Sequence, residues 1–411
     1  MTASQLLVRP LAPSEVLHFR FGLYVGYATR VRGTLDSAAL VQAFAILRQV
    51  YPILSARLVL DDTSQPSIEA APELPAMIDE VAGCIDDPLF GLPDLDDHAA
   101  AIHTVRGSDD TATVTLLTHH AIADGHHSLY LLAELWSLYT ACVGDVRIAP
   151  QRHDYPHSLE YLLDERGIGM GSLALPGDEM FGALADVKTS PGSSEGSRIR
   201  LSANETAALR ATGRGAGTTI NGLVSAALLA GIAQSRGVDI ETLNYTYVVD
   251  LRARLTPRVG YPEGTNVLSM AHFVADPRAG DDLLALARAI TGRLREEIAT
   301  GAIFAGSSAF MPTLDQPDAA TVGQPDAATL EALLSTVVMS TNWGVIPPLS
   351  APADLVIEDF YPIVPSSPIA SIVPHVITTY AGQLTIDTTA QPSEESRLLA
   401  EHLHALARLA Q

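Results

Sequence analysis

A segment of small and polar residues divides the chain into two parts of comparable length. Residues 189–197 read Thr-Ser-Pro-Gly-Ser-Ser-Glu-Gly-Ser, a composition typical of a flexible linker. The chain has 411 residues, roughly three times the commonest size of a single domain. We therefore predict an N-terminal domain over residues 1–180, a linker over 181–197 and a C-terminal domain over 198–411.

Both parts mix helical and strand patterns. Strands are expected where β-branched and aromatic residues cluster or alternate, at 23–32, 53–60, 99–106, 111–120 and 243–250, with a hairpin at 375–389. Helices are expected where apolar residues recur every three or four positions, at 36–51, 125–139, 203–212, 218–235, 281–299 and 393–409. This mixture predicts an α/β fold, of the α+β two-layer kind, in each part.

Charge and composition exclude several classes of protein. Hydrophobic residues make up 47% of the chain, which is enough for a folded core, and the formal net charge is −22. So acidic a surface repels phosphate backbones, and nucleic-acid binding is not expected. Since we find no secretory signal pattern and no long apolar run, we predict a cytoplasmic protein without an integral membrane segment.

One segment carries residues suited to catalysis. A strand of alternating polar and apolar residues runs into His119 and His120, and Asp124 and Gly125 follow. Neighbouring side chains on a strand point to opposite faces, so the two histidines cannot share one site. A neutral imidazole is a natural base for a hydroxyl or amine at neutral pH. A glycine at position 125 permits backbone angles that other residues resist.

Two other interpretations of this segment remain open. Four histidines within nine residues suggest a metal site, but their spacing matches no metal-binding pattern, and we expect no metal. Alternatively, both imidazoles are satisfied core residues without a chemical role. Residues 126 and 127 are expected to begin the following helix rather than to act in catalysis.

The motif His-His-Ala-Ile-Ala-Asp-Gly at 119–125 resembles the HHxxxDG signature of the acyl-CoA-dependent acyltransferase superfamily, which includes chloramphenicol acetyltransferase and condensation domains. Its continuation through His126-His127 into a Leu-rich helix is most similar to the polyketide-associated protein acyltransferases, the family of the phthiocerol/phthiodiolone dimycocerosyl transferases. A second match is Tyr-Val-Val-Asp-Leu-Arg at 247–252, followed by Gly-Thr-Asn at 264–266. The resemblance covers essentially the whole chain.

The resemblance implies a fold and roles for several residues. Two chloramphenicol-acetyltransferase-like subdomains would enclose an active-site channel. His120 would be the general base and Asp124 a structural carboxylate that orients the site, with His119 and Gly125 in support. We expect Arg252 to be the partner of Asp124, because a buried carboxylate needs a charge-assisted hydrogen bond. The alternative for Arg252 is a surface cation on a loop.

A third candidate lies in Ser-Thr-Asn-Trp-Gly at 340–344, which we expect to form a turn. The Asn342 amide could donate to an oxyanion that develops on a thioester carbonyl. It could equally be an ordinary turn residue. The segment reproduces the superfamily's Asp-Phe-Gly-Trp-Gly element only in part.

The resemblance implies an O-acyltransferase without a bound cofactor. It would move an acyl group from a thioester, on coenzyme A or an acyl-carrier protein, to a hydroxyl of a polyketide or lipid-like secondary metabolite. No serine or cysteine elbow offers a covalent nucleophile. The alternatives are an amide-forming free-standing condensation enzyme and a non-catalytic relative that binds a carrier protein or metabolite. We expect a monomer.

A short tandem duplication has no assigned role. The six residues Gln-Pro-Asp-Ala-Ala-Thr occur at 316–321 and again at 324–329. Proline and small residues bury little surface, so the sequence favours a lengthened surface loop. A lid or a carrier-protein contact is the alternative.

Overall fold

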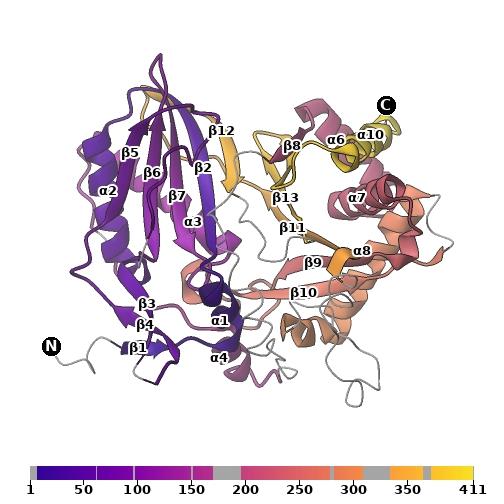
Figure 1. The fold of residues 1–411 in the computed structure, drawn as a ribbon, viewed down its shortest axis with the longest axis horizontal. Coiled ribbons are helices and arrows are strands. Elements are labelled where there is room, and N and C mark those ends of the chain that lie inside the picture. The colour runs from indigo at the N-terminus through magenta and orange to yellow at the C-terminus, as the bar shows by residue number, and fades with distance from the viewer. Residues whose placement is uncertain are drawn as a thin grey trace.

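The computed structural model describes residues 7–61, 63–95, 98–149, 151–169, 196–277, 282–308, 334–363 and 372–410. The duplicated segments and all of the expected linker except residues 196–197 lie outside these ranges. The described residues form three sheets, two of them large and covered by helices (Figure 1).

The first large sheet is built mainly from the N-terminal half and has the strand order β12-β2-β7-β6-β5. Its strands are β2 (Tyr24–Gly33), β5 (Met77–Ala82), β6 (Ala100–Arg106), β7 (Thr111–His119) and β12 (Leu355–Ile363). Helices α2 (Ser37–Val50) and α3 (Gly125–Val143) pack together and bury one face of the sheet. The residues of α2 that recur at helical spacing are all buried, as the periodicity predicted: Leu40, Ala43, Phe44, Leu47 and Val50.

Smaller elements lie at one end of this sheet. They form a three-stranded sheet in the order β1-β4-β3, two short α-helices and one 3-10 helix. Their bounds are β1 (Leu7–Pro10), α1 (Pro13–Arg20), η2 (Pro52–Ser55), β3 (Ala56–Leu60), β4 (Pro66–Ala70) and α4 (Leu159–Asp164).

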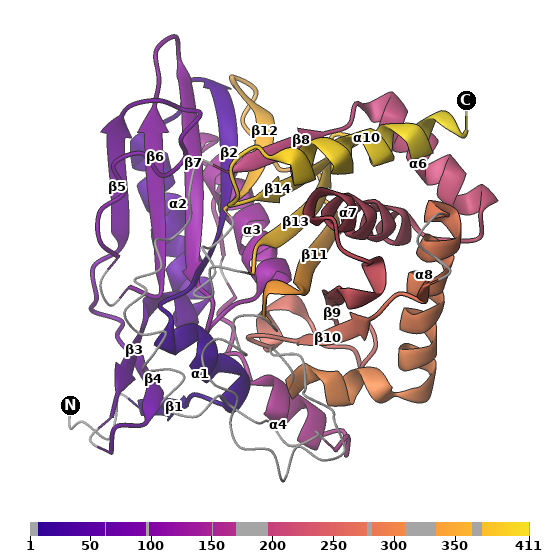
Figure 2. The same ribbon diagram turned by 45° about the vertical axis from the view of Figure 1, so that its right-hand side comes forward.

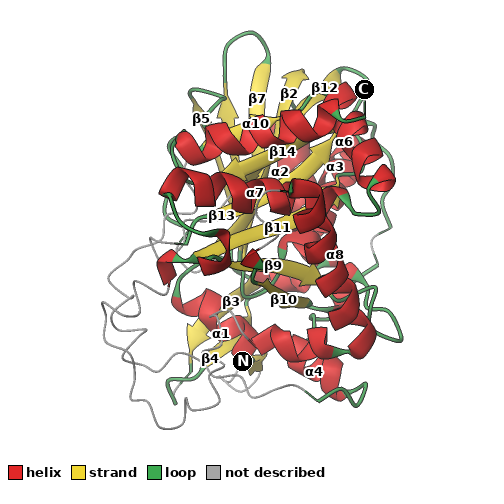
Figure 3. Cartoon of the chain, turned by 90° about the vertical axis from the view of Figure 1, so that its right-hand side faces the viewer, coloured by secondary structure: helices red, strands yellow, loops and turns green. Residues whose placement is uncertain are grey.

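The second large sheet has the order β10-β9-β11-β13-β14-β8 and mixes parallel with antiparallel pairs. Its strands are β8 (Ser197–Arg200), β9 (Asn244–Asp250), β10 (Leu268–Phe273), β11 (Val337–Val345), β13 (Pro374–Tyr380) and β14 (Gln383–Thr388). Helices α7 (Ile220–Arg236), α8 (Leu283–Thr300) and α10 (Glu394–Arg408) lie across one face of it (Figure 3). The remaining elements of this half are α6 (Ala203–Gly215), η3 (Ile240–Thr242), η4 (Tyr261–Glu263) and η6 (Ala302–Ser308).

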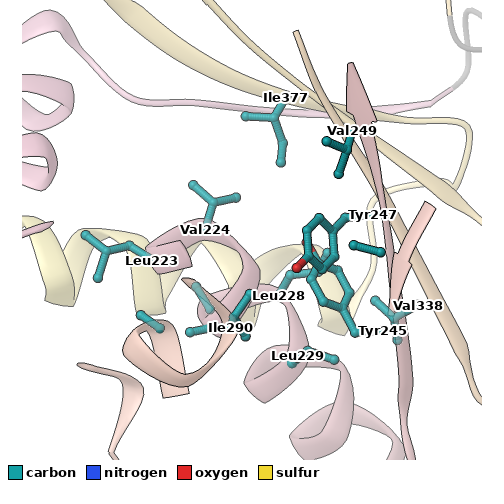
Figure 4. Close-up of a cluster of buried hydrophobic side chains, with 14 of the residues drawn as sticks. Leu223, Val224, Leu228, Leu229, Tyr245, Tyr247, Val249, Ile290, Val338 and Ile377 are labelled. Atoms are coloured by element: carbon teal, nitrogen blue, oxygen red, sulfur yellow. The ribbon is translucent and has the colours of Figure 1, made fainter. Parts of the chain in front are cut away.

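The core of the second half lies between α7 and the sheet. Leu223, Val224 and Leu228 of α7 are buried in one cluster with Tyr245 and Tyr247 of β9 (Figure 4). The two halves therefore have separate hydrophobic cores, each with a sheet and its helices.

One strand crosses between the halves. The chain runs from β11 in the second sheet to β12, which pairs antiparallel with β2 in the first sheet, and then returns to β13. β12 and β8 lie side by side where the two sheets approach each other (Figures 1 and 2), and Arg200 of β8 pairs there with Asp359 of β12 at 2.5 Å. No pattern in the sequence indicated that a strand from the second half would complete the first sheet.

The length and composition of the helices can be compared with the prediction that the chain has no integral membrane segment. Among the described residues, no single helix is both long and apolar enough to cross a membrane. Within the described ranges, one pair of helices, α6 and α7, is long and apolar enough when the two are taken together, but they are bent by 99° relative to each other.

Candidate active site

His120 lies directly after β7, and its ring is oriented by an asparagine from the other half of the chain. Its backbone N–H donates to Leu23 O at 2.7 Å. Its Nδ1 lies 3.0 Å from Asn266 Oδ1, and the Asn266 amide Nδ2 donates to His120 O at 2.8 Å. Because the second bond fixes which end of the amide faces the ring, Nδ1 is the protonated nitrogen, and Nε2 carries the free lone pair.

His120 remains accessible and neutral. Its side chain is only partly buried. Burial lowers its pKa from the ordinary value of histidine, although Asp124 and the bond to Asn266 act in the opposite direction. A neutral, partly exposed imidazole with a free Nε2 is able to accept a proton at neutral pH.

A second imidazole lies flat on the ring of His120. His18, near the end of α1, stacks on it with 3.9 Å between ring centroids and 6° between planes. Sequence reasoning missed His18, because nothing in a short helix at the N-terminus signals contact with a residue about a hundred positions away.

His119 has a different environment. Its side chain is buried against Tyr24, and its Nδ1 accepts from Ala121 N at 3.1 Å. Burial, with a smaller contribution from His120, lowers the pKa of His119 to about 3. The two neighbouring histidines thus contact different residues, and His119 is a neutral, buried side chain.

Asp124 is fully buried and joins three segments. Oδ1 accepts from His127 N at 2.9 Å and so caps α3, while Oδ2 accepts from Val267 N at 3.0 Å and pairs with Arg252 Nη1 at 2.8 Å. Burial alone would raise the pKa of this carboxyl, but Arg252 and the further bonds hold it below its ordinary value. The carboxylate makes no hydrogen bond to the His120 ring, whose Nδ1 is taken by Asn266.

Arg252 is buried beside Asp124 rather than exposed on a loop. Only 3% of its side chain is exposed, and it also contacts Asp250 at 3.2 Å. The ring of Tyr261 lies over its guanidinium at 5.6 Å. The expected contact between Arg252 and Asp124 is present in the structure.

A second buried carboxylate anchors the segment that carries Asn266. Glu15 on α1 is fully buried, is held by two bonds of 2.7 Å from Arg9, and accepts from Thr265 Oγ1 at 2.6 Å. Asp124 N donates to Thr265 O at 3.0 Å. Residues 264–267 are therefore fixed on both sides of Asn266 by the N-terminal half.

Gly125 is required for a reason other than the one expected. Its backbone angles lie outside the left-handed region, so the explanation from backbone freedom is wrong. A Cβ at this position would lie 2.7 Å from Nε1 of Trp343, which also packs edge-on against Tyr27. The absent side chain lets β11 approach the start of α3.

Asn342 lies in β11 and not in a turn, which corrects the expectation for 340–344. The strand continues to Val345 through an irregularity between Asn342 and Gly344, where Gly344 has a φ of 73°. Asn342 Nδ2 donates to Asn221 Oδ1 at 2.9 Å, and its Oδ1 accepts from Gly344 N at 2.8 Å. The structure gives no contact between Asn342 and His120.

His126 and His127 occupy the first turn of α3, as expected. The described residues contain no group of three or more histidine, cysteine, aspartate or glutamate side chains arranged to hold a metal ion.

Comparison with known proteins identifies the family. The family model described as "Phthiocerol/phthiodiolone dimycocerosyl transferase C-terminus" matches residues 190–389. A phthiocerol/phthiodiolone dimycocerosyl transferase of Mycobacterium ulcerans is 30% identical over 371 residues, which cover 86% of this chain and 85% of that protein. The chain belongs to the phthiocerol/phthiodiolone dimycocerosyl transferase family. The resemblance inferred from the two motifs is confirmed.

Solved structures show that the fold is shared with known proteins. The structure of polyketide synthase associated protein 5 from Mycobacterium tuberculosis is similar to that of this chain, with a TM-score of 0.77 and 25% identity over 99% of this chain and 98% of that one. Trichothecene 15-O-acetyltransferase from Fusarium sporotrichioides shares the fold, with a TM-score of 0.65 and 13% identity, over 97% of this chain and 94% of that one. The expected α/β fold is confirmed. As a member of this transferase family, the chain is an acyltransferase.

Proposed function

We propose that this acyltransferase moves an acyl group from a thioester donor to a hydroxyl of a polyketide or lipid-like acceptor, with His120 as the general base. The donor would be an acyl-CoA or an acyl-carrier protein. The observation that supports the proposal is the state of His120: partly exposed, neutral, and held by Asn266 so that Nε2 is its free nitrogen. The phthiocerol/phthiodiolone dimycocerosyl transferases among its relatives favour a lipid-like acceptor.

The proposed reaction needs no covalent enzyme intermediate. Nε2 of His120 accepts the hydroxyl proton as the oxygen attacks the thioester carbonyl, and a tetrahedral oxyanion forms. The intermediate collapses by breaking the carbon–sulfur bond, and the departing thiolate takes the proton from the His120 imidazolium. The products are an ester and a free thiol. A role for Asn342 in binding the oxyanion stays a prediction.

The other site residues would act on His120 only through its surroundings. The Asp124–Arg252 pair fixes the start of α3 against the end of β9, and the same carboxylate holds residue 267 beside Asn266. We therefore propose an orienting role for Asp124 and Arg252, not a proton-transfer role. His119 and Gly125 would be supporting residues for packing reasons.

The test is to mix the purified chain with long-chain acyl-CoA and a matched pair of acceptors, a long-chain alcohol and the amine of equal length. Ester and free thiol in equal amounts are expected, detected by mass spectrometry and a thiol reagent. His120→Ala should lower kcat by about a hundred- to ten-thousandfold, the range for a general base. His126→Ala, in the first turn of α3, is the matched control and should retain the activity. Amide as the main product would favour the condensation alternative, and full activity in His120→Ala would remove that residue from the mechanism.

A further inference from the structure

The stacked His18 ring is not explained by the proposed chemistry. Its plane is nearly parallel to that of His120, so neither ring nitrogen points at the other residue, and no proton passes between them directly. His18 is partly buried, and its Nδ1 is enclosed without a hydrogen-bond partner among the described residues. The ring therefore meets His120 by its face alone.

The hydrogen bond to Asn266 does not prevent the His120 ring from rotating out of its plane. That bond selects which of two flipped orientations His120 adopts, because only Nδ1–H, and not a carbon, donates to Oδ1. Rotation away from that plane by a few tens of degrees would only weaken the bond. A flat ring 3.9 Å away blocks such intermediate rotations by contact. The two constraints act on different motions.

The helix that carries His18 is hydrogen-bonded to the segments that carry His120 and Asn266. Glu15, one turn before His18 on α1, bonds Thr265 beside Asn266. At the other end, Leu23 N donates to His18 O at 3.1 Å, and Leu23 O accepts from His120 N at 2.7 Å. The helix that carries His18 is thus joined by hydrogen bonds both to the backbone of His120 and to the segment that holds its Nδ1.

We propose that His18 is a positioning residue of this acyltransferase: its ring is a fixed, uncharged platform that holds the plane of His120, so that Nε2 stays aligned with the acceptor hydroxyl. The inference rests on the proposed function of His120. Holding a base within a fraction of an ångström of the productive geometry accelerates a reaction without any contact to the substrate.

The electrostatic surroundings are consistent with an uncharged platform. The ring of His120 is faced by His18 on α1, His119 on β7 and Asp124 before α3, and Asn266 bonds its edge. Burial, and then the neighbouring His120 and His119, hold the pKa of His18 well below its ordinary value. His18 therefore stays neutral while His120 gains its proton. A neutral ring does not repel the positive charge that forms on His120 during catalysis.

Three variants test the proposal in the full chain, with acyl-CoA and the alcohol acceptor. His18→Ala removes the platform and should lower kcat about tenfold or more with little change in KM. It also admits water to His120, whose pKa should rise toward the ordinary value, so the acid limb of kcat/KM should move to higher pH. His18→Phe keeps the flat face and should restore both kcat and the acid limb to nearly wild-type values.

Val16→Ala controls for damage to α1, because position 16 lies about 200° around the helix from position 18 and packs into the core of the N-terminal half. It should lower the melting temperature without moving kcat or the acid limb. A His18→Ala enzyme with wild-type kcat and acid limb would overturn the proposal, as would a His18→Phe enzyme as slow as His18→Ala. If His120→Ala also retained its activity, the proposed function itself would fail; if His120→Ala were inactive, the failure would concern His18 alone.

Discussion

Asp124 and Arg252 form an ion pair across the two halves, with 0% and 3% of their side chains exposed. Without Asp124, the buried Arg252 keeps only Asp250, at 3.2 Å, as its counter-charge. We expect Asp124→Asn to lower the free energy of unfolding at pH 7 by about 3 kcal/mol, the lower end of the range for breaking a buried ion pair. Urea denaturation followed by circular dichroism measures this. Adding Arg252→Met, which removes the stranded charge, should recover part of the loss, and equal loss in the single and double variants would show that the pair is not coupled.

The same pair gives the stability a defined dependence on pH. The folded state holds the pKa of Asp124 below its ordinary value, so the carboxylate stabilises the fold above that value. The contribution is lost as the pH falls through the folded pKa. The difference in unfolding free energy between the wild type and Asp124→Asn should therefore be constant near neutrality and shrink in acid, below a pH of about 4. A constant difference down to pH 2 would contradict this explanation.

At the residue scale, the sequence predicted contacts that follow from local geometry or charge. Strand alternation separated His119 from His120, and the need of a buried carboxylate for a cation led to Arg252. The contacts that orient the His120 ring were not predicted, although Asn266 belongs to the Gly-Thr-Asn segment that the family resemblance picked out. Neither the stacking of His18 on the ring nor the hydrogen bond from the ring to Asn266 depends on charge or periodicity, and both partners lie far from His120 in the chain.

At the element scale, the contact between α3 and β11 can be tested at Gly125. A Cβ there would lie 2.7 and 2.8 Å from two atoms of the Trp343 indole, which Tyr27 confines from another side. We expect Gly125→Ala to cost about 1–3 kcal/mol of stability through overpacking, despite the higher helix propensity of alanine. Gly292→Ala in α8 is the matched control, because its Cβ would meet nothing within 4 Å and should stabilise the helix slightly. Combining Gly125→Ala with Trp343→Leu should restore stability; no restoration would mean that the indole is not the obstacle.

Elements with a strong period were predicted and weakly patterned ones were not. β2, α2, β7 and α3 follow the expected positions within a few residues. β4 and β5 fall in the acidic, proline-interrupted stretch 61–98, where short strands leave no clear alternation. β12 was also not predicted, since its run Leu-Val-Ile-Glu-Asp-Phe-Tyr-Pro-Ile contains a proline at its next-to-last position, which only an edge strand tolerates. The limits proposed for the two domains stay a prediction.

At the scale of the whole molecule, β12 joins the stability of one half to that of the other. Losing the second half withdraws a strand from the first sheet, so we expect both to unfold in one transition. In the Trp343→Phe variant, Trp136 is the remaining tryptophan and reports on the N-terminal core. Its fluorescence and the far-ultraviolet circular dichroism should give the same midpoint in urea. Two separated midpoints would show that the halves unfold independently.

The borrowed strand also imposes an order on biosynthesis. β2 leaves the ribosome early, but its neighbour on that side begins only at Leu355. At roughly 5–20 residues per second, translation needs on the order of tens of seconds to deliver it. During that time the sheet of the nascent chain has an unpaired edge at β2. Unpaired strand edges are sites at which chains aggregate. Slow synthesis of this acyltransferase in a heterologous host should therefore favour inclusion bodies, and a chaperone that shields strand edges should relieve them.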